Sequence, residues 1–194
     1  MNVTISIVGL GLLILIHEAG HFFVARAVGM NPRKFYVGFP PALVKRTRNG
    51  IEYGVGAIPL GGYVKIPGMH RPAAGDLDVH LGRAVAEDPS LLPTYEELYS
   101  RLEASDHPGA RAAIADFRDL MDVERLTPGA AKAAARGLGD IDDALAPDAY
   151  WRARTWKRVA VIFAGPGANL LLAIALFAGL FLAASGGFRL GFVL

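Results

Sequence analysis

Two long apolar stretches constrain the fold of this 194-residue chain more than any other feature. The first runs from Val3 to Arg26, and its only ionisable residues before Arg26 are His17, Glu18 and His21. As a helix it spans about 34 Å, enough to cross a hydrocarbon core of about 30 Å. No basic residue precedes Arg26, so the pattern favours a retained helix over a signal peptide. The second stretch, from about 159 to 184, holds no charge and predicts another transmembrane helix.

Ionisable residues inside the first stretch are costly in a membrane unless they face a metal, a partner or a cavity. His17 and His21 are four residues apart, so one helix face can present both imidazoles to a single metal ion. Glu18 is a candidate base for a metal-bound water, the arrangement of helical zinc peptidases. Two imidazoles also suit cobalt, nickel or copper. The alternative is a pair of core histidines hydrogen-bonded inside a helical bundle.

The second stretch contains the motif Gly165-Pro166-Gly167-Ala168-Asn169. Pro166 removes a backbone donor and predicts a kink, while Gly165 lets another backbone approach closely. Asn169 is the strong hydrogen-bonding side chain of this stretch. It can face the metal helix and hold the cleaved peptide or the catalytic water. A packing kink with an interhelical hydrogen bond is an equally good interpretation.

Basic residues orient the molecule. They follow the first stretch and precede the second, whereas only Arg189 follows the second. We therefore expect the loop 30–158 to be cytoplasmic and both termini of this chain to lie on the outer side. The formal net charge of +2 is too small to indicate nucleic acid, and the bilayer explains the basic flanks.

The loop has two parts of different character. Alternation and turns predict strands at 34–38, 42–48, 51–57 and 61–66, with a type I′ hairpin turn at Asn49-Gly50. Gly61 and Gly62 leave backbone uncovered, so an exposed strand edge here can pair with an extended substrate. A structural cap is at least as good an interpretation.

The remainder of the loop, from about 69 to 150, is rich in Ala, Asp, Glu, Leu and Arg and predicts three or four short helices. Thr94 with Glu97, and Thr127 before Pro128, are helix-start signals. The histidines of this part have no partner at ligand spacing, and we interpret them as solvated loop residues: His70, His80 and His107.

The predicted fold class is membrane α-helical with a small cytoplasmic β element: two transmembrane helices flanking a β-hairpin-rich segment and a short helical insert. The expected domains are a transmembrane helix at 1–29, a membrane-associated β region at 30–69, a cytoplasmic helical insert at 70–150, a second transmembrane helix at 151–185, and the start of a continuation at 186–194.

Three stretches resemble the site-2 protease family of intramembrane zinc metalloproteases. They are HEAGH, YGVGAIPLGGYVKIPGM from 53 to 69, and WKRVAVIFAGPGANLLL from 156 to 172. The resemblance implies that His17 and His21 bind Zn²⁺, one ion per complete site, and that Glu18 is the catalytic acid and base. It also implies a substrate-guiding β element within 34–66 and an active-site role for 165–169.

Members of this family cut single-pass membrane proteins such as anti-sigma factors, a process called regulated intramembrane proteolysis. The resemblance therefore implies a membrane-embedded hydrolase, in a bacterial cytoplasmic membrane, with the lipid bilayer and a membrane-protein substrate as its partners. No nucleic acid is expected.

One feature of the family has no counterpart in this sequence. The third zinc ligand of the family is an Asp in a later transmembrane helix, commonly before Gly, and the sequence has no Asp-Gly pair. We therefore expect a fragment of a longer protease, weakly active or inactive by itself. A two-span protein completed by a partner subunit is a second interpretation. A non-catalytic membrane regulatory protein that keeps the fold, and a metal transporter, are the alternatives from other classes.

Overall fold

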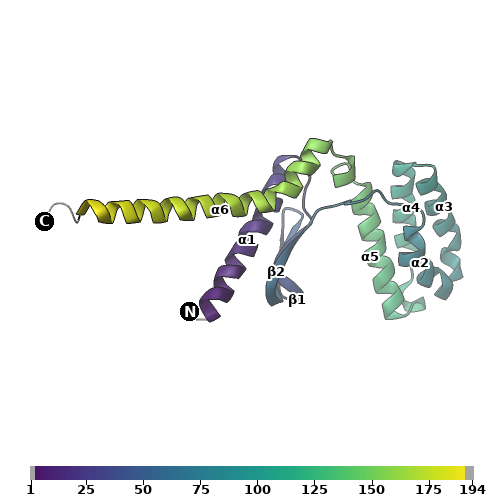
Figure 1. Cartoon of the computed structure of the whole chain (residues 1–194). Helices are drawn as coiled ribbons and strands as arrows, with labels where there is room; N and C mark the ends of the chain where they lie inside the picture. Colours follow the sequence, from purple (N-terminus) through teal and green to yellow (C-terminus); the bar gives the residue numbers. More distant parts are fainter. Residues whose placement is uncertain (1–2, 191–194) are drawn as a thin grey trace. The chain divides into compact units, whose positions relative to one another are not determined.

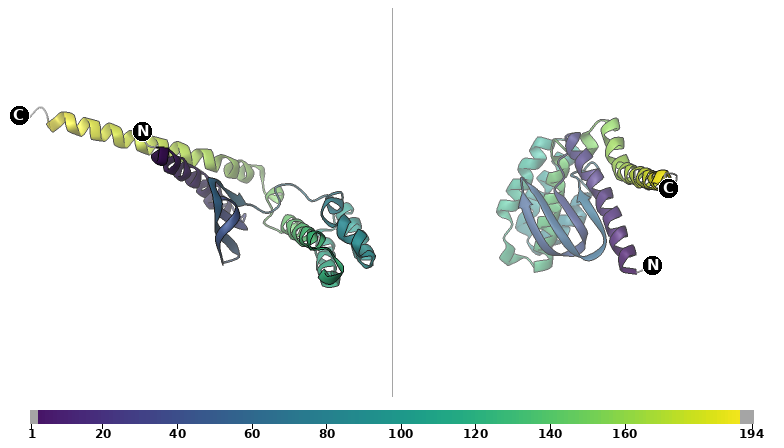
Figure 2. Two further views of the ribbon diagram at one scale, coloured as in Figure 1. Left: turned by 90° about the horizontal axis from the view of Figure 1, so that it is seen from below. Right: turned by 90° about the vertical axis from the view of Figure 1, so that its left-hand side faces the viewer.

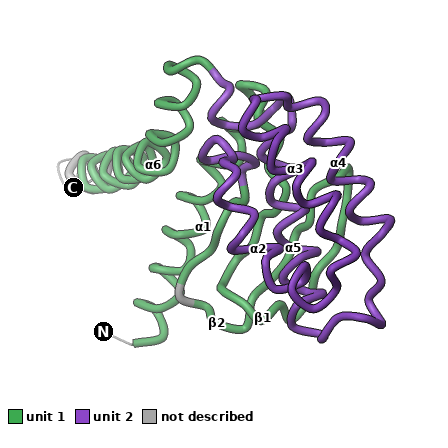
Figure 3. Tube along the Cα trace, turned by 90° about the vertical axis from the view of Figure 1, so that its right-hand side faces the viewer, with its two compact units in different colours: residues 1–65, 154–194 green, residues 66–153 purple. Residues whose placement is uncertain are grey.

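A computed structural model describes residues 3–190, which form two compact units (Figure 3). One unit combines 1–65 with 154–194, and the other comprises 66–153. The first contains the long helices and the β strands, and the second contains the remaining helices. The fold is therefore mostly helical with one antiparallel sheet, as the sequence predicts.

Helices α1 (Val3–Ala27) and α6 (Thr155–Leu190) are the two long apolar helices of the first unit (Figure 1). Over Val3–Ala27 and Thr155–Ser185 they are long and apolar enough to cross a membrane, and most of their side chains are exposed. This is the property of helices that meet lipid rather than a protein core. The expected continuation from 186 begins inside α6, and 191–194 lie outside the described residues.

Pro166 lies inside α6, which continues through it. Figure 1 shows this helix changing direction in its first third. A proline removes one helical hydrogen bond and crowds the preceding turn, so the helix bends without ending. The predicted motif therefore produces a bend within one helix.

Helices α1 and α6 approach each other closely at Gly20. A Cβ atom at Gly20 would lie 2.5 Å from the carbonyl oxygen of Ala164 and 3.0 Å from the Cβ of Ala168. Near the end of α1, the Lys157 ammonium donates to the carbonyl of Val28 at 2.7 Å. Small residues at the crossing therefore let the backbones meet, and a basic side chain satisfies one terminal carbonyl.

Strands β1 (Lys34–Arg48) and β2 (Ile51–Lys65) are joined by the predicted turn, in which Asn49 and Gly50 both have positive φ, 51° and 76°. That geometry confirms the type I′ prediction. The register is more complex than a simple hairpin, because residues 34–37 pair with 52–55 and also with 62–65. The last part of β2 therefore forms an edge, and Figure 2 shows the twisted strands beside α1.

An aromatic cluster joins α1 to the sheet. The ring of Phe22 packs edge-on against Phe35 and Tyr53, with centroid distances of 5.1 and 5.9 Å. Within the sheet, the hydroxyl of the buried Tyr36 donates to Glu52 at 2.6 Å. Lys34 also pairs with Glu52 at 3.2 Å. These contacts fix the strands against the helix that carries the histidines.

The second unit contains four α-helices, in agreement with the three or four short helices that the sequence predicts. Its helices are α2 (Asp76–Glu87), α3 (Leu92–Glu103), α4 (His107–Leu120) and α5 (Pro128–Leu145), with 3-10 turns at Pro89–Leu91, Val123–Arg125 and Tyr150–Arg152. They enclose one apolar core, whose large fully buried members include Leu77, Leu81, Leu98, Ile114, Phe117 and Leu138. The insert thus has the core of a small domain.

Two predictions about this unit fail, and one is confirmed. The Thr127 hydroxyl caps α5 by accepting from the amide of Ala130, as expected. Thr94 is no cap, because α3 already begins at Leu92. His80 lies in α2 and His107 in α4, so these two histidines are helical and not loop residues.

Candidate active site

Two imidazole rings converge where α1 crosses α6. The Nε2 atoms of His17 and His21 are 3.2 Å apart, one helical turn from each other along α1. Two nitrogens bound to one tetrahedral zinc at about 2.05 Å would be separated by about 3.3 Å. The spacing therefore fits a shared zinc ion and the expectation drawn from the HEAGH motif.

Gly165 of α6 faces this pair of nitrogens. A Cβ atom there would lie 2.4 Å from Nε2 of His21 and 2.5 Å from Nε2 of His17. The space between the rings and α6 therefore exists only because position 165 has no side chain. Pro166, which the sequence also placed in the site, is exposed on α6 next to this glycine.

The outer nitrogens of both rings are held by α6. Nδ1 of His21 lies 2.7 Å from the carbonyl oxygen of Val161, so this nitrogen carries the proton and donates it. Nε2 is then left with a lone pair for a metal ion. A backbone carbonyl in this position is the usual device that fixes the tautomer and orientation of a metal-binding histidine.

Asn169 holds the second ring. Its side-chain nitrogen lies 3.2 Å from Nδ1 of His17, while its Oδ1 is buried and has no partner among the described residues. A histidine that binds metal through Nε2 has a proton on Nδ1 and needs an acceptor there. Turning the amide by 180° about the Cβ–Cγ bond exchanges its oxygen and nitrogen and supplies that acceptor. The contact thus favours Asn169 as a partner of His17, not of the peptide.

Glu18 lies between the histidines and the end of β2. Its carboxylate accepts a hydrogen bond from the backbone amide of Val64, and its Cγ lies 3.2 Å from where a Cβ of Gly62 would be. Val64 pairs with Phe35 in the sheet, so this edge of β2 faces the carboxylate. The hydrogen bond between Val64 and Glu18 could not be predicted from residue spacing, because it depends on the pairing of the last part of β2 with β1.

Gly62 and Gly61 differ in their surroundings, although the sequence grouped them. Gly62 touches the site, as described. A Cβ at Gly61 would instead meet the ring of Phe39, at 2.3 Å. Gly61 therefore accommodates the aromatic ring inside the sheet and does not reach the histidines.

Among the described residues, no third His, Cys, Asp or Glu joins the pair in a group that could hold a metal. The donors present are two imidazoles, with a carboxylate beside them. These residues fit two of the ligands of a zinc ion and one candidate base.

The sequence profile of peptidase family M50 matches residues 5–189, which covers α1, the sheet, the helical unit and nearly all of α6. This chain belongs to the M50 family, the site-2 proteases. Among its relatives, the zinc metalloprotease Rip1 of Mycobacterium tuberculosis is 31% identical over 163 residues, covering 84% of this chain and 24% of that protein.

Two further relatives extend the comparison. A Chlamydia pneumoniae protein named as a candidate zinc metalloprotease is 31% identical over 178 residues, 92% of this chain and 19% of its own length. The regulator of sigma-E protease RseP of Salmonella typhimurium is 47% identical over 81 residues, 41% of this chain and 18% of its own. The chain spans about a fifth of the length of these curated relatives.

Proposed function

We propose that this M50 chain carries the metal-binding half of an intramembrane zinc metalloprotease. The observation that supports this most directly is the pair of Nε2 atoms 3.2 Å apart, facing a glycine and flanked by Glu18, between two helices of membrane-spanning length. His17 and His21 would hold the zinc, and the remaining protein ligand would come from outside the described residues.

A zinc ion bound here would polarise the scissile carbonyl and lower the pKa of a bound water. Glu18 would accept a proton from the attacking water and donate it to the leaving amine. The amide of Val64 orients the Glu18 carboxylate, while Val161 and Asn169 hold the imidazole rings in the tautomer that leaves both Nε2 atoms free. Each contact therefore fixes one reacting group before substrate arrives.

The edge of β2 supplies a way to present the substrate. A helical peptide hides its carbonyl groups in its own hydrogen bonds, so a protease must bind it in an extended form. The Val64 amide, in the last part of β2, donates to the Glu18 carboxylate. An extended chain that added to this edge, beside Gly62, would run past the catalytic carboxylate. The apolar side chains exposed on the sheet, including Phe39, Leu43, Val44 and Ile58, suit a position at the membrane surface.

We propose membrane proteins with one transmembrane segment as substrates, with anti-sigma factors as an example. One relative is named as a regulator of sigma-E protease, which supports this class. The proposed location is a bacterial cytoplasmic membrane, with the loop 30–158 in the cytoplasm and both ends of this chain on the outer side.

The test is cleavage of a single-pass membrane substrate by the whole protein in liposomes. Glu18→Gln should lower the rate at least about a hundredfold and retain zinc, because it removes only the proton acceptor. His17→Ala should lose both zinc and activity. Glu96→Gln, on the exposed face of α3, is the matched control and should leave both unchanged.

Two outcomes would reject the proposal. If Glu18→Gln cleaves at the wild-type rate, Glu18 is not the base. If the wild type binds the substrate and never cleaves it, the non-catalytic membrane regulatory protein becomes the better interpretation.

A further inference from the structure

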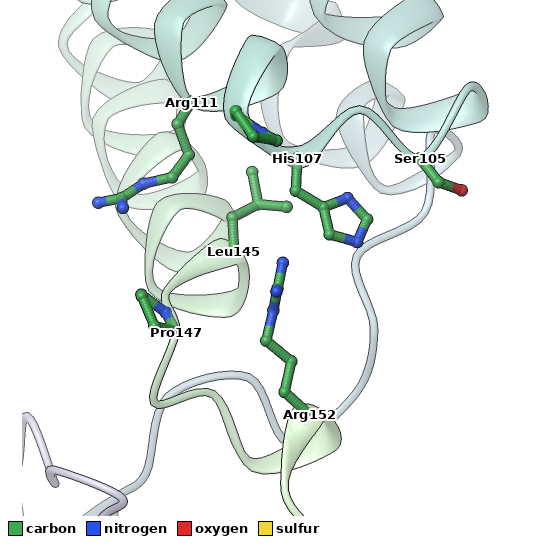
Figure 4. A pocket seen from close by; sticks show the side chains of 7 residues that line it. Ser105, His107, Arg111, Leu145, Pro147 and Arg152 are labelled. Carbon is green, nitrogen blue, oxygen red and sulfur yellow. The ribbon is translucent and has the colours of Figure 1, made fainter.

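The helical unit has a cavity of about 330 Å³ where α4 begins and α5 ends (Figure 4). Its size is that of a small-molecule site. Figure 4 shows Arg152 extending toward the ring of His107 and Leu145, while the guanidinium of Arg111, on α4, points away from them. The cavity is lined by Ser105, His107, Pro108, Arg111, Leu145, Pro147 and Arg152. It lies within 66–153 and shares no residue with the histidine site of α1.

Positive charge at this cavity comes from Arg152, which lines it, and from Arg71, which is bonded to the lining residue Ser105. Arg71 donates to the hydroxyl of Ser105 at 2.6 Å, and Arg71 and Arg152 lie 5.7 and 4.7 Å from the ring centre of Trp151. In the part of the chain that the structure describes, neither arginine forms an ion pair with a carboxylate. Stacking on an aromatic ring orders a guanidinium without neutralising it. Both groups therefore keep their charge for a ligand.

Arg111 differs from these two, because it already has a partner. It forms an ion pair with Asp142 at 2.9 Å, and Arg118 also contacts that carboxylate at 3.5 Å. One carboxylate thus serves two arginines. The carboxylate of Asp142 therefore leaves no net negative charge at the cavity.

His107 provides a third polar group. It is the first residue of α4, and its ring packs edge-on against Trp151 at 5.5 Å. Its Nδ1 atom is buried and has no partner within the part of the chain that the structure describes. Burial lowers the pKa of His107, and the nearby Arg152 and Arg71 lower it further, while Asp106 acts in the opposite direction. Asp106 itself is bonded to Arg101 at 2.8 Å and to the amide of Gly109. The imidazole therefore has an unused hydrogen-bonding atom in positive surroundings.

We propose that this cavity binds the phosphate group of a phosphate ester. Arg152 offers the planar, two-pronged donor that matches phosphate oxygens, and His107 offers a further hydrogen bond. Arg71, bonded to Ser105, adds positive charge beside them. The start of α4 adds the favourable end of a helix dipole. Leu145, Pro147 and Pro108 form an apolar wall for the organic part of the ester.

The ester has two possible sources, a phospholipid headgroup or a soluble metabolite. Arg152 precedes Thr155, the first residue of the apolar helix α6, by three positions, so the chain itself keeps this arginine close to a membrane surface. Either source presents the same phosphate chemistry to the cavity. The experiment distinguishes them by using one ligand of each kind.

The test uses the whole chain in an uncharged detergent, titrated with glycerol 3-phosphate in one arm and short-chain phosphatidic acid in the other. Isothermal titration calorimetry gives the affinity, and the ¹⁵N resonances of His107 report its pKa. Binding should raise that pKa, because the bound anion offsets the field of the two arginines. Arg152→Gln should weaken binding at least about tenfold. The affinity of Arg152→Lys should lie between those of the wild type and Arg152→Gln.

Arg136→Gln is the matched control, since it removes the same charge from an exposed site on α5. It should leave the affinity unchanged. Binding in both arms identifies the headgroup as an acceptable source, and binding of glycerol 3-phosphate alone identifies a soluble ester. Absence of binding in both arms would overturn the proposal, as would equal losses in Arg136→Gln and Arg152→Gln. If circular dichroism shows that Arg152→Gln does not fold, two other measurements test the proposal. Arg71→Gln should weaken binding, and the His107 resonances of the wild type should shift on titration with ligand; absence of both effects would overturn the proposal.

Discussion

At the scale of single residues, the absence of a side chain at position 165 is the most exacting requirement of the site. A methyl group there would lie about 2.4–2.5 Å from the Nε2 atoms of both His17 and His21, so Gly165→Ala should displace at least one imidazole. We expect zinc affinity to fall at least about tenfold, measured by competition with a chelator. Gly167→Ala, two residues further along α6, would meet nothing closer than 3.6 Å and should bind zinc normally. Equal affinities in both variants would contradict the assigned ring positions.

Asn169 gives a second prediction at this scale. If its amide oxygen accepts from Nδ1 of His17, Asn169→Ala should weaken zinc binding about 10–100-fold while the fold persists. Cobalt in place of zinc offers a spectroscopic check, since its visible absorption reports coordination independently of activity. If the zinc affinity and the cobalt spectrum of Asn169→Ala are unchanged, Asn169 contributes only to the packing of the helices.

The sequence could predict part of this site for a simple reason. His17 and His21 are local to one helix, so their spacing determines that they share a face. Gly165 and Asn169 were found as an unusual motif, but their contacts with the rings depend on where α1 and α6 cross. The bond from Val64 to Glu18 depends on the register of the sheet, which no local pattern contains.

At the scale of elements, the sheet carries a partly buried polar pair, Tyr36 and Glu52, that can be tested. The hydrogen bond from Tyr36 lowers the pKa of Glu52, with Lys34 and Lys45 acting in the same direction, and the same bond raises the pKa of Tyr36 to about 12. Tyr36→Phe should cost about 2 kcal/mol at pH 7, measured by chemical unfolding in detergent. Tyr53→Phe is the control, because no hydrogen bond of its hydroxyl occurs among the described residues.

The loss of stability in Tyr36→Phe should depend on pH, and the lowered pKa of Glu52 gives the direction of that dependence. A carboxylate whose folded pKa is lowered stabilises the fold above its unfolded value, near 4.5, and loses that contribution as the pH falls through the folded pKa. The difference between Tyr36→Phe and the wild type should therefore shrink as the pH is lowered from 7 to 3. A difference that stays constant would mean that Glu52 is not the acceptor.

Elements with strong local signals were predictable, and those set by distant pairing were not. Thr127 followed by Pro128 is an unambiguous start, and α5 begins there. The prediction of a helix start at Thr94 is wrong, because α3 begins at Leu92 and Pro93 lies in its first turn. The start signals of Pro93 and Thr94 overlapped in the sequence. The double pairing of 34–37 lay beyond the sequence pattern, since the same alternation suits either neighbour.

At the scale of the whole molecule, the charge distribution leads to a prediction of topology. Basic residues cluster beside both apolar helices on the side of the loop 30–158, so that loop should remain in the cytoplasm. The chain has no cysteine, which allows single cysteines to serve as reporters. Arg136→Cys, exposed on α5, should react with a membrane-impermeant maleimide only after cells are opened. Thr4→Cys, at the start of α1, should react in intact cells.

The same labelling experiment tests on which side of the membrane the cleaved product would be released. With the loop in the cytoplasm, His17 and His21 lie in the half of α1 nearer that side, because they follow its midpoint. Cleavage by the whole protein would then release the cytoplasmic part of a substrate. Labelling of Arg136→Cys in intact cells, with Thr4→Cys protected, would invert the orientation and place product release on the opposite side. The zinc site would be unaffected by that inversion, whereas the choice of an anti-sigma factor as substrate would fail, because such a substrate must deliver its product to the cytoplasm.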